Sequence, residues 1–471
     1  MTSIKRHFVL GITALVSAQL VSCGGSDAPP SIASSTQPAA TAIAPAPGNV
    51  NASVSGLRAG GTATLLVTSG SLSKTVTVSE NGQAVVATGL PAGAAYSVSL
   101  TSKPDYQSCP LSGARGKIQS GITVTFSMDC TENPMLALVA NSALNAGISA
   151  YTIDSATGSL TAVVGSPFAA GTAPQAITTS SDGRFAYVAN RDSGDVSAFS
   201  IHPSTGALTS VPGSPFAAGR QPYVVTMSPN GRFVYVANFG GGISAYTMDP
   251  STGALSNIAR SPFSDRTSPR AIEISADGQV AYVADYSGRN LLTFTIDPDS
   301  GALTLSRTLR IDGFPRFLRL SLDGQVLYVI NEASSAINSY GISPTTGELV
   351  FFRAAQVGDF PTSIALRASG SNGNVAYVTD ASSNTATAYS VMITEQFAQL
   401  RDPQPTGANP SSIALSPDGR FAYTANENFS NTPGGFSISA FAIDSGSGVL
   451  SSIGTEPAGR APKAIATTRV R

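Results

Sequence analysis

The sequence predicts an all-β protein, in which a small β-sandwich precedes a seven-bladed β-propeller of four-stranded antiparallel blades. The 471 residues include 46 glycines and 30 prolines but no tryptophan. With no long apolar stretch at helical spacing, this composition favours short strands joined by tight turns. A segment similar to "YVAN" recurs about every 48 residues, a period typical of propeller blades. An Asp-Gly or Asn-Gly pair precedes six of these segments, as β-hairpins with type I′ turns require.

The first 23 residues have the order of a secretory signal peptide. A basic start is followed by an apolar run from Phe8 to Val21, which is too short for a membrane-spanning helix. The residues up to Cys23 resemble a bacterial lipobox, so we expect cleavage before Cys23 and lipidation of this cysteine. The alternative is an ordinary cleaved signal. Gly24 stands where an aspartate would retain a lipoprotein in the inner membrane, so the pattern favours a lipid anchor in the outer membrane of a Gram-negative bacterium.

Two segments separate this signal from the repeats. Residues 24–50 are rich in Pro, Ala and Ser and are expected to form an extended tether. Residues 51–131 alternate apolar and polar residues between turn signals such as "ENG" and "LPAG", which predicts a small β-sandwich. Cys109 and Cys130 are expected to form a disulfide there, because the compartment is oxidising. The segment resembles prealbumin-like domains of secreted bacterial proteins, which implies a spacer or an adhesive module.

Residues 132–471 hold seven copies of the repeat. In each complete copy, a strand that begins at proline, the "YVAN" strand and two further strands give four antiparallel strands. The first copy has no strand that begins at proline before it, whereas the C-terminus carries "APKAIATTR". We therefore expect the C-terminal strand to complete the first blade and close the ring. The seven "YVAN" segments end at Asn141, Asn190, Asn238, Asp285, Asn331, Asp380 and Asn426.

The repeats carry family motifs. The segments "SPDGRFAYTAN", "VSAFSI", "TGALT" and "GSPF" resemble the seven-bladed β-propeller lactonase family, which includes bacterial 6-phosphogluconolactonases. The resemblance covers about 340 residues. It implies a propeller fold and the hydrolysis of a sugar-acid lactone such as 6-phosphogluconolactone.

His202 is the only histidine beyond the predicted signal peptide. It stands directly before a "TG" turn, on the face where every turn is short and alike. We expect it to be a turn residue and not a catalytic base, because a repeated position has a structural reason. Lactonases that use a histidine are therefore poor mechanistic models for this chain. The corresponding position in other repeats holds Asp154, Asp249, Asp297 and Asp444.

Four charged residues interrupt the small residues of the strands that begin at proline. Arg270 and Glu273 lie in one such strand, and Arg316 and Arg319 in the next. Innermost strands of neighbouring blades should bring them together beside the central channel. In one interpretation, the arginines bind an anion and polarise a carbonyl while Glu273 activates water to open a lactone. In the other, Glu273 and Arg319 form a buried ion pair that needs no ligand.

Further substrate-binding candidates lie near this cluster. Tyr223 occupies the position of Arg270 in the preceding repeat. Asp285 and Arg289 lie in a loop on the face whose loops vary between blades, where binding residues concentrate. The Asn or Asp that closes each "YVAN" segment also has an interpretation as a turn cap. The other residues that could form a pocket mouth or be solvated are Arg191, Asp192, Tyr286, Glu332 and Glu427.

Composition narrows the function. The 27 Lys and Arg against 28 Asp and Glu leave no basic excess that would attract nucleic acid. We expect no metal and no cofactor, because neither ligand spacing nor a glycine-rich phosphate loop is present. Two functions remain: a cell-envelope hydrolase of a small-molecule lactone, and a non-catalytic lipoprotein that binds an envelope protein or glycan. A phosphorylated sugar-acid lactone is a cytoplasmic metabolite, which counts against that substrate.

Overall fold

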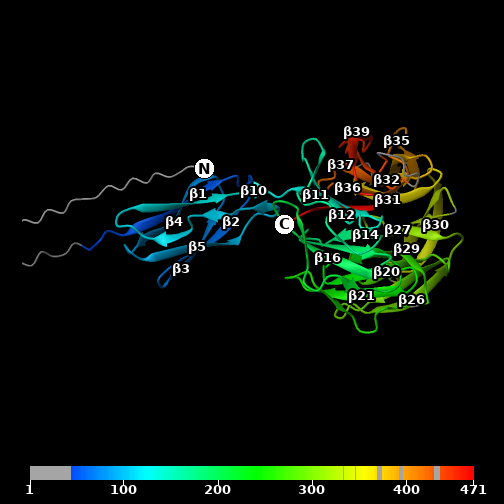
Figure 1. The fold of residues 1–471 in the computed structure, drawn as a ribbon, viewed down its shortest axis with the longest axis horizontal. Helices are drawn as coiled ribbons and strands as arrows, with labels where there is room; N and C mark the ends of the chain where they lie inside the picture. Colours follow the sequence, from blue (N-terminus) through cyan, green and yellow to red (C-terminus); the bar gives the residue numbers. More distant parts are fainter. Residues whose placement is uncertain are drawn as a thin grey trace, which may run out of the picture. The chain divides into compact units, whose positions relative to one another are not determined.

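The computed structural model describes residues 44–264, 266–332, 334–344, 346–368, 374–391, 396–428 and 435–471. The predicted signal peptide, Cys23 and most of the predicted tether lie outside these residues. All regular elements of the described part are β-strands (Figure 1), which confirms the all-β prediction. Among the described residues, no helix could cross a membrane.

The N-terminal β-strands form two four-stranded sheets. Apolar side chains alternate along β1 and β2, so one side of each strand is buried. β1 pairs with β9 in parallel, whereas its pairing with β4 is antiparallel. One sheet has the order β4 (Gly82–Leu90), β1 (Gly48–Ser55), β9 (Thr123–Asp129), β7 (Leu111–Ser112), and the other β3 (Leu72–Val78), β2 (Ala63–Ser69), β5 (Ala95–Ser102), β8 (Arg115–Lys117).

A disulfide joins Cys109 and Cys130, which are 21 residues apart in the sequence. It lies where the short strands β6 (Gln107–Ser108) and β10 (Thr131–Glu132) pair. Both cysteines are buried in the same apolar core as Phe126. The bond therefore links the end of β9 to the segment after β5.

The first four blades of the propeller follow the repeats. Each sheet is antiparallel, and its strand that begins at proline is innermost. Blade 1 consists of β40 (Pro462–Arg469), β11 (Met135–Asn141), β12 (Ile148–Ile153) and β13 (Leu160–Ala162); blade 2 of β14 (Pro174–Thr179), β15 (Phe185–Asn190), β16 (Asp195–Ile201) and β17 (Leu208–Ser210), with β18 (Phe216–Ala217) beside β16; blade 3 of β19 (Pro222–Met227), β20 (Phe233–Asn238), β21 (Gly242–Met248) and β22 (Leu255–Asn257); and blade 4 of β23 (Pro269–Ile274), β24 (Val280–Asp285), β25 (Asn290–Ile296) and β26 (Leu303–Arg310).

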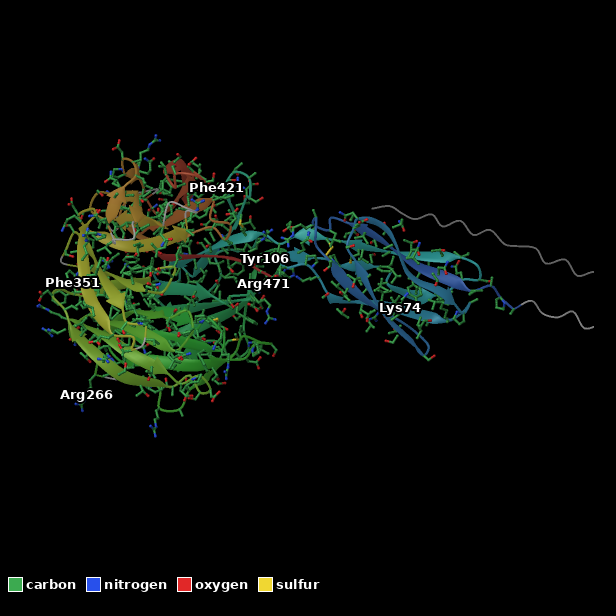
Figure 2. The ribbon with its side chains drawn as sticks, turned by 180° about the vertical axis from the view of Figure 1, so that it is seen from behind. Lys74, Tyr106, Arg266, Phe351, Phe421 and Arg471 are labelled. Carbon is green, nitrogen blue, oxygen red and sulfur yellow. A yellow bond between two sulfur atoms is a disulfide. The ribbon has the colours of Figure 1, made fainter. Side chains whose placement is uncertain are left out.

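Three further blades complete the ring. The outermost strand β30 is long and exposes Phe351 to solvent (Figure 2). Blade 5 consists of β27 (Pro315–Leu320), β28 (Val326–Asn331), β29 (Ala336–Ile342) and β30 (Leu349–Gln356); blade 6 of β31 (Pro361–Ala368), β32 (Asn374–Asp380), β33 (Thr385–Val391) and β34 (Phe397–Gln399), with β35 (Gln404–Pro405) beside β33; and blade 7 of β36 (Pro410–Leu415), β37 (Phe421–Asn426), β38 (Ser437–Ile443) and β39 (Leu450–Pro457).

The C-terminal strand closes the ring, as predicted. β40 pairs antiparallel with β11, with Ala466 opposite Leu138. β40 also contacts the innermost strands of both neighbouring blades, β14 and β36. The innermost strands therefore continue around the ring without a free edge, which removes an aggregation-prone strand.

The apolar core of the propeller lies between adjacent blades. The "YVAN" strands are buried on both faces, because each packs against the blades before and after it. Tyr235 of blade 3 and Val283 of blade 4, for example, belong to one apolar cluster. The tyrosine hydroxyls also link blades: Tyr187 donates to the Gly253 carbonyl at 2.9 Å, and each such bond satisfies a turn carbonyl of the next blade.

His202 lies in an exposed turn. Its backbone N–H donates to the Ala207 carbonyl, and its own carbonyl accepts from Gly206. In four other blades the residue in this place is an aspartate whose carboxylate accepts turn amides, as Asp154 does from Thr157 at 2.7 Å. The structure thus places His202 among the turn residues and away from the central cavity.

Candidate functional site

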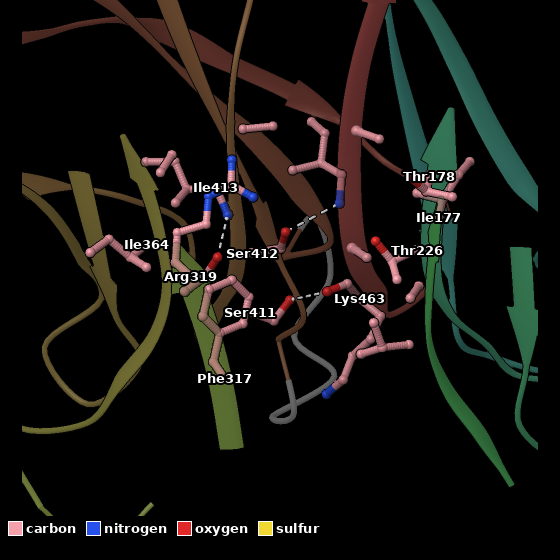
Figure 3. A pocket seen from close by; sticks show the side chains of 18 of the residues that line it. Ile177, Thr178, Thr226, Phe317, Arg319, Ile364, Ser411, Ser412, Ile413 and Lys463 are labelled. Atoms are coloured by element: carbon pink, nitrogen blue, oxygen red, sulfur yellow. Dashed lines mark hydrogen bonds between the residues drawn. The ribbon is translucent and has the colours of Figure 1, made fainter. Parts of the chain in front are cut away.

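A cavity of about 510 Å³ occupies the centre of the propeller. The innermost strands of all seven blades supply its wall, and Figure 3 shows Arg319, Ser411 and Lys463 around it. In each of these strands the ladder shifts register directly after the proline, and such bulges redirect a side chain. The residues that follow the prolines all line the cavity, and we call them the cavity ring: Gln175, Tyr223, Arg270, Arg316, Thr362, Ser411 and Lys463.

The four charged residues singled out in the sequence share this cavity. Arg270, Glu273, Arg316 and Arg319 all contribute to its wall. Glu273 and Arg319 lie three residues further along their strands than Arg270 and Arg316 of the cavity ring. The structure therefore arranges the charges in two tiers, one at the cavity ring and one deeper along the strands.

Glu273 and Arg319 make one long contact in the deeper tier. Arg319 Nη1 lies 3.5 Å from Glu273 Oε1. The Glu273 side chain is 22% exposed and that of Arg319 is 44% exposed. Burial raises the pKa of Glu273, and the opposing effect of Arg319 is the smaller of the two. A glutamate with a raised pKa is a stronger base than an ordinary one and is suited to general base catalysis.

Arg270 is held firmly in the cavity ring. Its Nη1 lies 3.2 Å from Glu332 Oε2, and its Nη2 donates to the Tyr223 hydroxyl at 3.3 Å. The guanidinium also lies over the rings of Tyr223 and Tyr286, at 5.1 Å and 4.6 Å from their centroids, an arrangement that cation–π attraction favours. Tyr286 in turn donates a short hydrogen bond to Glu332.

Arg316 has weaker support although its side chain is only 16% exposed. Its Nη1 lies 3.7 Å from Glu332 Oε1, and its guanidinium packs over Phe360. Its guanidinium donates no hydrogen bond to any residue that the structure describes. Burial, followed by the positive charge of Arg270, lowers the pKa of Arg316. Arg316 thus lines the cavity, and its N–H groups have no hydrogen-bond acceptor within the described part of the chain.

Tyr223 differs from the tyrosines that link the blades. Burial acts to raise its pKa, but the positive charges of Arg270, Lys463 and Arg316 outweigh burial and lower the pKa. Its hydroxyl accepts the hydrogen bond from Arg270. Burial instead raises the pKa of Tyr187 in the blade core.

Asp285 and Arg289 do not line the cavity. Asp285 is 5% exposed, and its carboxylate accepts hydrogen bonds from Ser268 N and Gly288 N and from Asn290 Nδ2. These donors give it a turn-capping role, and the expected contact with substrate stays a prediction. The Arg289 guanidinium lies over the ring of Phe314 at 4.3 Å, outside the cavity wall.

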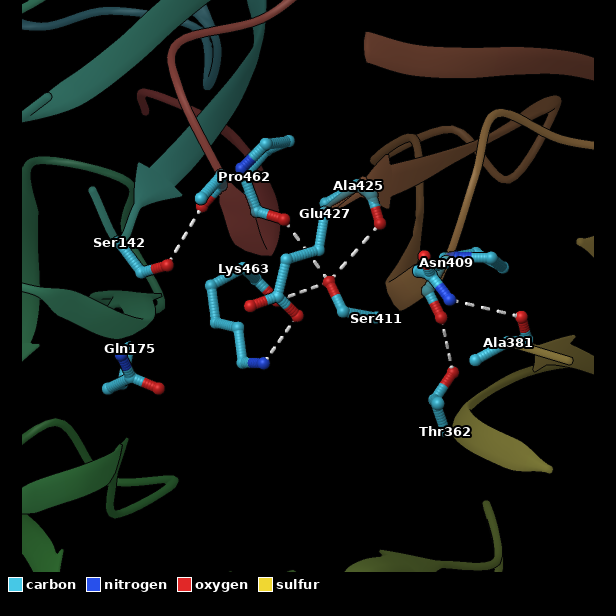
Figure 4. A network of polar contacts seen from close by, with 12 residues as sticks. Ser142, Gln175, Thr362, Ala381, Asn409, Ser411, Ala425, Glu427, Pro462 and Lys463 are labelled. Atoms are coloured by element: carbon cyan, nitrogen blue, oxygen red, sulfur yellow. Dashed lines mark hydrogen bonds and ion pairs between the residues drawn. The ribbon is translucent and has the colours of Figure 1, made fainter. Parts of the chain in front are cut away.

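Two carboxylates from loops complete the ionic contacts of the cavity ring. Glu332 reaches both Arg270 and Arg316, and Glu427 Oε2 lies 2.5 Å from Lys463 Nζ (Figure 4). The sequence placed both glutamates at the variable face but did not pair them with these cations. The available signal is their shared position, because each directly follows the asparagine that closes a "YVAN" segment.

No cluster of His, Cys, Asp and Glu suited to a metal ion occurs within the described ranges. The arrangement can bind an anion through arginine and lysine side chains. It can also accept a proton at Glu273.

The comparisons with known proteins agree with the fold. The pattern of the family described as lactonase, seven-bladed β-propeller, matches residues 138–261, 243–366 and 368–470. No curated protein matches the chain.

Solved structures share the propeller at low sequence identity. A putative 6-phosphogluconolactonase from Bacteroides fragilis is 21% identical, with a TM-score of 0.59, and the match covers 71% of this chain and 98% of that one. The periplasmic gluconolactonase of Pseudomonas aeruginosa is 20% identical, with a TM-score of 0.59, and the match covers 72% and 99%. A protein from Lactobacillus plantarum is 19% identical, with a TM-score of 0.59 and coverage of 71% and 99%. At this identity the likeness shows the fold alone.

Proposed function

The chain belongs to the lactonase family of seven-bladed β-propellers, and from this premise we propose that its central cavity hydrolyses a sugar-acid lactone. One observation carries the proposal. The same cavity holds Glu273, whose pKa is raised by burial, and Arg316, whose guanidinium has no hydrogen-bond acceptor among the described residues. A base and an anion receptor in one cavity are what the hydrolysis of an acidic ester requires.

Glu273 acts as the general base. It takes a proton from water as the water oxygen bonds to the lactone carbonyl carbon. Arg319, 3.5 Å from the Glu273 carboxylate, faces the carbonyl oxygen as it gains negative charge. The bond between the carbonyl carbon and the ring oxygen then breaks, and Glu273 returns the proton to that oxygen. One water is consumed, the product is the open hydroxy acid, and both side chains regain their initial state.

The cavity ring holds the acidic end of the substrate. Arg270 and Arg316 precede Glu273 and Arg319 by three residues on their strands, a separation of roughly 10 Å along an extended chain. A substrate whose anion contacts the ring therefore extends its other end toward Glu273. Tyr223 and Phe360 flank the arginines and cover the apolar faces of a bound sugar.

The location belongs to the same proposal. The signal and lipobox pattern ending at Cys23 supports a lipid-anchored hydrolase of the cell envelope, with the outer membrane favoured by Gly24. The relative from Pseudomonas aeruginosa is a periplasmic protein. The segment 51–131 then acts as a spacer between the anchor and the propeller.

A second function is favoured by the contact between Glu273 and Arg319. An ion pair that neutralises itself needs no substrate, and the propeller face would then bind an envelope protein or glycan without catalysis. The contact is long and both side chains reach the cavity, so hydrolysis accounts for the arrangement better.

The test is hydrolysis of a panel of γ- and δ-lactones by protein that begins at Gly24. We expect turnover by the wild type and a loss of about 100-fold or more in Glu273→Gln, because removal of a general base has this scale. Glu348→Gln is the matched control, since Glu348 is an exposed carboxylate paired with Arg307 at 3.7 Å. Absence of turnover on every lactone would contradict the proposal and favour the binding function.

A further inference from the structure

The charges around the cavity define the charge of its ligand. Four cationic side chains line the wall, but only three carboxylates of the described residues pair with them. Lys463 has Glu427, and Arg319 has Glu273, whereas Arg270 and Arg316 share Glu332. One positive charge is therefore in excess among the described residues of the site, and it resides in the arginine pair.

The excess charge lies at Arg316. Glu332 is 3.2 Å from Arg270 but 3.7 Å from Arg316, so its carboxylate serves the first arginine better. The Arg316 side chain is mostly buried, and no described residue accepts a hydrogen bond from its guanidinium. Arg270 adds a buried Nε without an acceptor in the described structure. A planar carboxylate satisfies a guanidinium through two parallel hydrogen bonds.

The neighbouring carboxylates limit what else the ligand carries. Ionised Glu332 and Glu427 can only accept hydrogen bonds. Burial acts to raise the pKa of Glu332, but the hydrogen bond from Tyr286 and the two arginines outweigh burial and lower the pKa, so this group is ionised. Hydroxyl groups on the ligand can donate to such carboxylates, whereas a second negative charge beside them is repelled.

From this arrangement we infer that the substrate is a polyhydroxy lactone with one free carboxylate, the monolactone of a sugar diacid, whose carboxylate binds Arg316. The inference rests on the proposed function. A neutral lactone leaves the Arg316 donors without an acceptor. A phosphorylated lactone brings a dianion beside Glu332, and the net charge of the occupied site becomes negative.

The first experiment compares lactones with one six-carbon skeleton that differ only at C6. The C6 group is hydroxymethyl in gluconolactone, carboxylate in glucarolactone and phosphorylated hydroxymethyl in 6-phosphogluconolactone. We expect kcat/KM for the carboxylated lactone to exceed that of each of the other two at least tenfold. A preference for the phosphorylated lactone, or equal rates for all three, would overturn the inference while leaving hydrolysis established.

Variants test the assigned contact. Arg316→Met should lower the ratio of kcat/KM between the carboxylated and the neutral lactone by about tenfold or more, and Glu332→Gln should shift preference toward the phosphorylated one. Arg307→Met is the control, because Arg307 is exposed on β26 and pairs with Glu348. An unchanged ratio in Arg316→Met would contradict the contact between the substrate carboxylate and Arg316. This conclusion holds even if Glu332→Gln does not fold.

Binding without chemistry separates this inference from the proposed function. Calorimetry would use methyl glucoside, its C6 carboxylate and its C6 phosphate, none of which is a lactone. Tighter binding of the carboxylate that is lost in Arg316→Met supports the charge assignment even where no lactone is opened. Tighter binding of the phosphate, or binding of none of the three together with equal lactone rates, overturns it.

Discussion

Arg316 lies 3.7 Å from the carboxylate of Glu332 and donates no hydrogen bond to it. The same carboxylate accepts a hydrogen bond from Arg270 at 3.2 Å. Two buried guanidinium groups thus depend on one anion, which is unfavourable for folding in the absence of a ligand. The arrangement has the properties of a preorganised anion receptor, in which stability is lost to favour binding.

Replacement of Arg316 by methionine should therefore not lower the stability of the unliganded protein. Burial and Arg270 both disfavour its charge, and methionine fills much of the same volume without a charge. We expect the variant to unfold at an equal or higher temperature than the wild type. The C6 carboxylate of methyl glucoside should stabilise the wild type, by about 2.7 kcal/mol at a concentration one hundred times its Kd. It should leave the stability of the variant unchanged.

Thermal unfolding with and without this ligand measures both effects. Arg307→Met serves as the control and should respond to the ligand as the wild type does. A loss of more than about 1 kcal/mol in unliganded Arg316→Met would show that the guanidinium stabilises the fold, contrary to the receptor role.

The raised pKa of Glu273 gives a pH dependence with a definite sign. Below its unfolded pKa of about 4.3, Glu273 is protonated in both states and burial costs nothing. As pH rises through the raised folded pKa, the group must ionise in the cavity and the wild type loses stability. Glu273→Gln has no such titration, so its stability relative to the wild type should increase from pH 4 to neutral pH. Denaturant unfolding across this range measures the difference.

The same titration governs the rate. Hydrolysis should increase with pH through a pKa above the ordinary glutamate range, because the base is active when ionised. A constant stability difference between the wild type and Glu273→Gln over this range would show that the folded pKa is not raised and would remove Glu273 as the base.

Much of the propeller and part of its site could be predicted from the sequence. Each innermost strand starts at a proline, and six of the seven are followed by an Asp-Gly or Asn-Gly pair, so local chemistry fixes their register. Residues at equal distance from the proline, such as Arg270 and Arg316, then have to meet in the cavity. The closing strand could be found in the same way, because Pro462 begins a strand that lacks partners in its own repeat.

The loop partners could not be predicted, for a physical reason. Glu332 contacts arginines on two strands, Arg270 and Arg316. The position of Arg270 is set by the rings of Tyr223 and Tyr286, and this packing depends on neighbouring blades. The Asp285 carboxylate likewise accepts hydrogen bonds from the backbone N–H groups of Ser268 and Gly288, which lie in two different loops. Side chains of loops take their direction from tertiary contacts that local pattern does not contain.

Tyr423 links the last blade to the first. Its buried hydroxyl donates to the Gly158 carbonyl at 2.8 Å. Tyr423→Phe leaves that carbonyl without the bond, and we expect a loss of about 1–2 kcal/mol in unfolding free energy. Tyr187→Phe is the matched control, since Tyr187 makes the same bond to Gly253 within the ring. Chemical denaturation should give similar losses for both, whereas a neutral Tyr423→Phe would show that the closing bond does not contribute.

Gly358 is required by a contact with the capping carboxylate of blade 6. A Cβ atom added there would lie 1.5 Å from Asp380 Oδ2. Asp380 is 2% exposed, and its Oδ1 accepts hydrogen bonds from the backbone N–H groups of Phe360, Ser382 and Ser383. The carboxylate therefore cannot move aside without leaving buried donors unsatisfied.

Gly358→Ala should accordingly lower the unfolding free energy by about 2–4 kcal/mol, the scale of overpacking combined with lost buried hydrogen bonds. Gly341→Ala on β29 is the matched control, because the nearest atom to its added Cβ is 3.9 Å away and alanine costs less chain entropy on folding than glycine. Gly341→Ala should be neutral or slightly stabilising. Equal stability of the two variants in urea would mean that the loop before β31 can move to accommodate the added methyl group. The hydrogen bonds of Asp380 would then not stabilise this face of the propeller, on which the cavity ring lies.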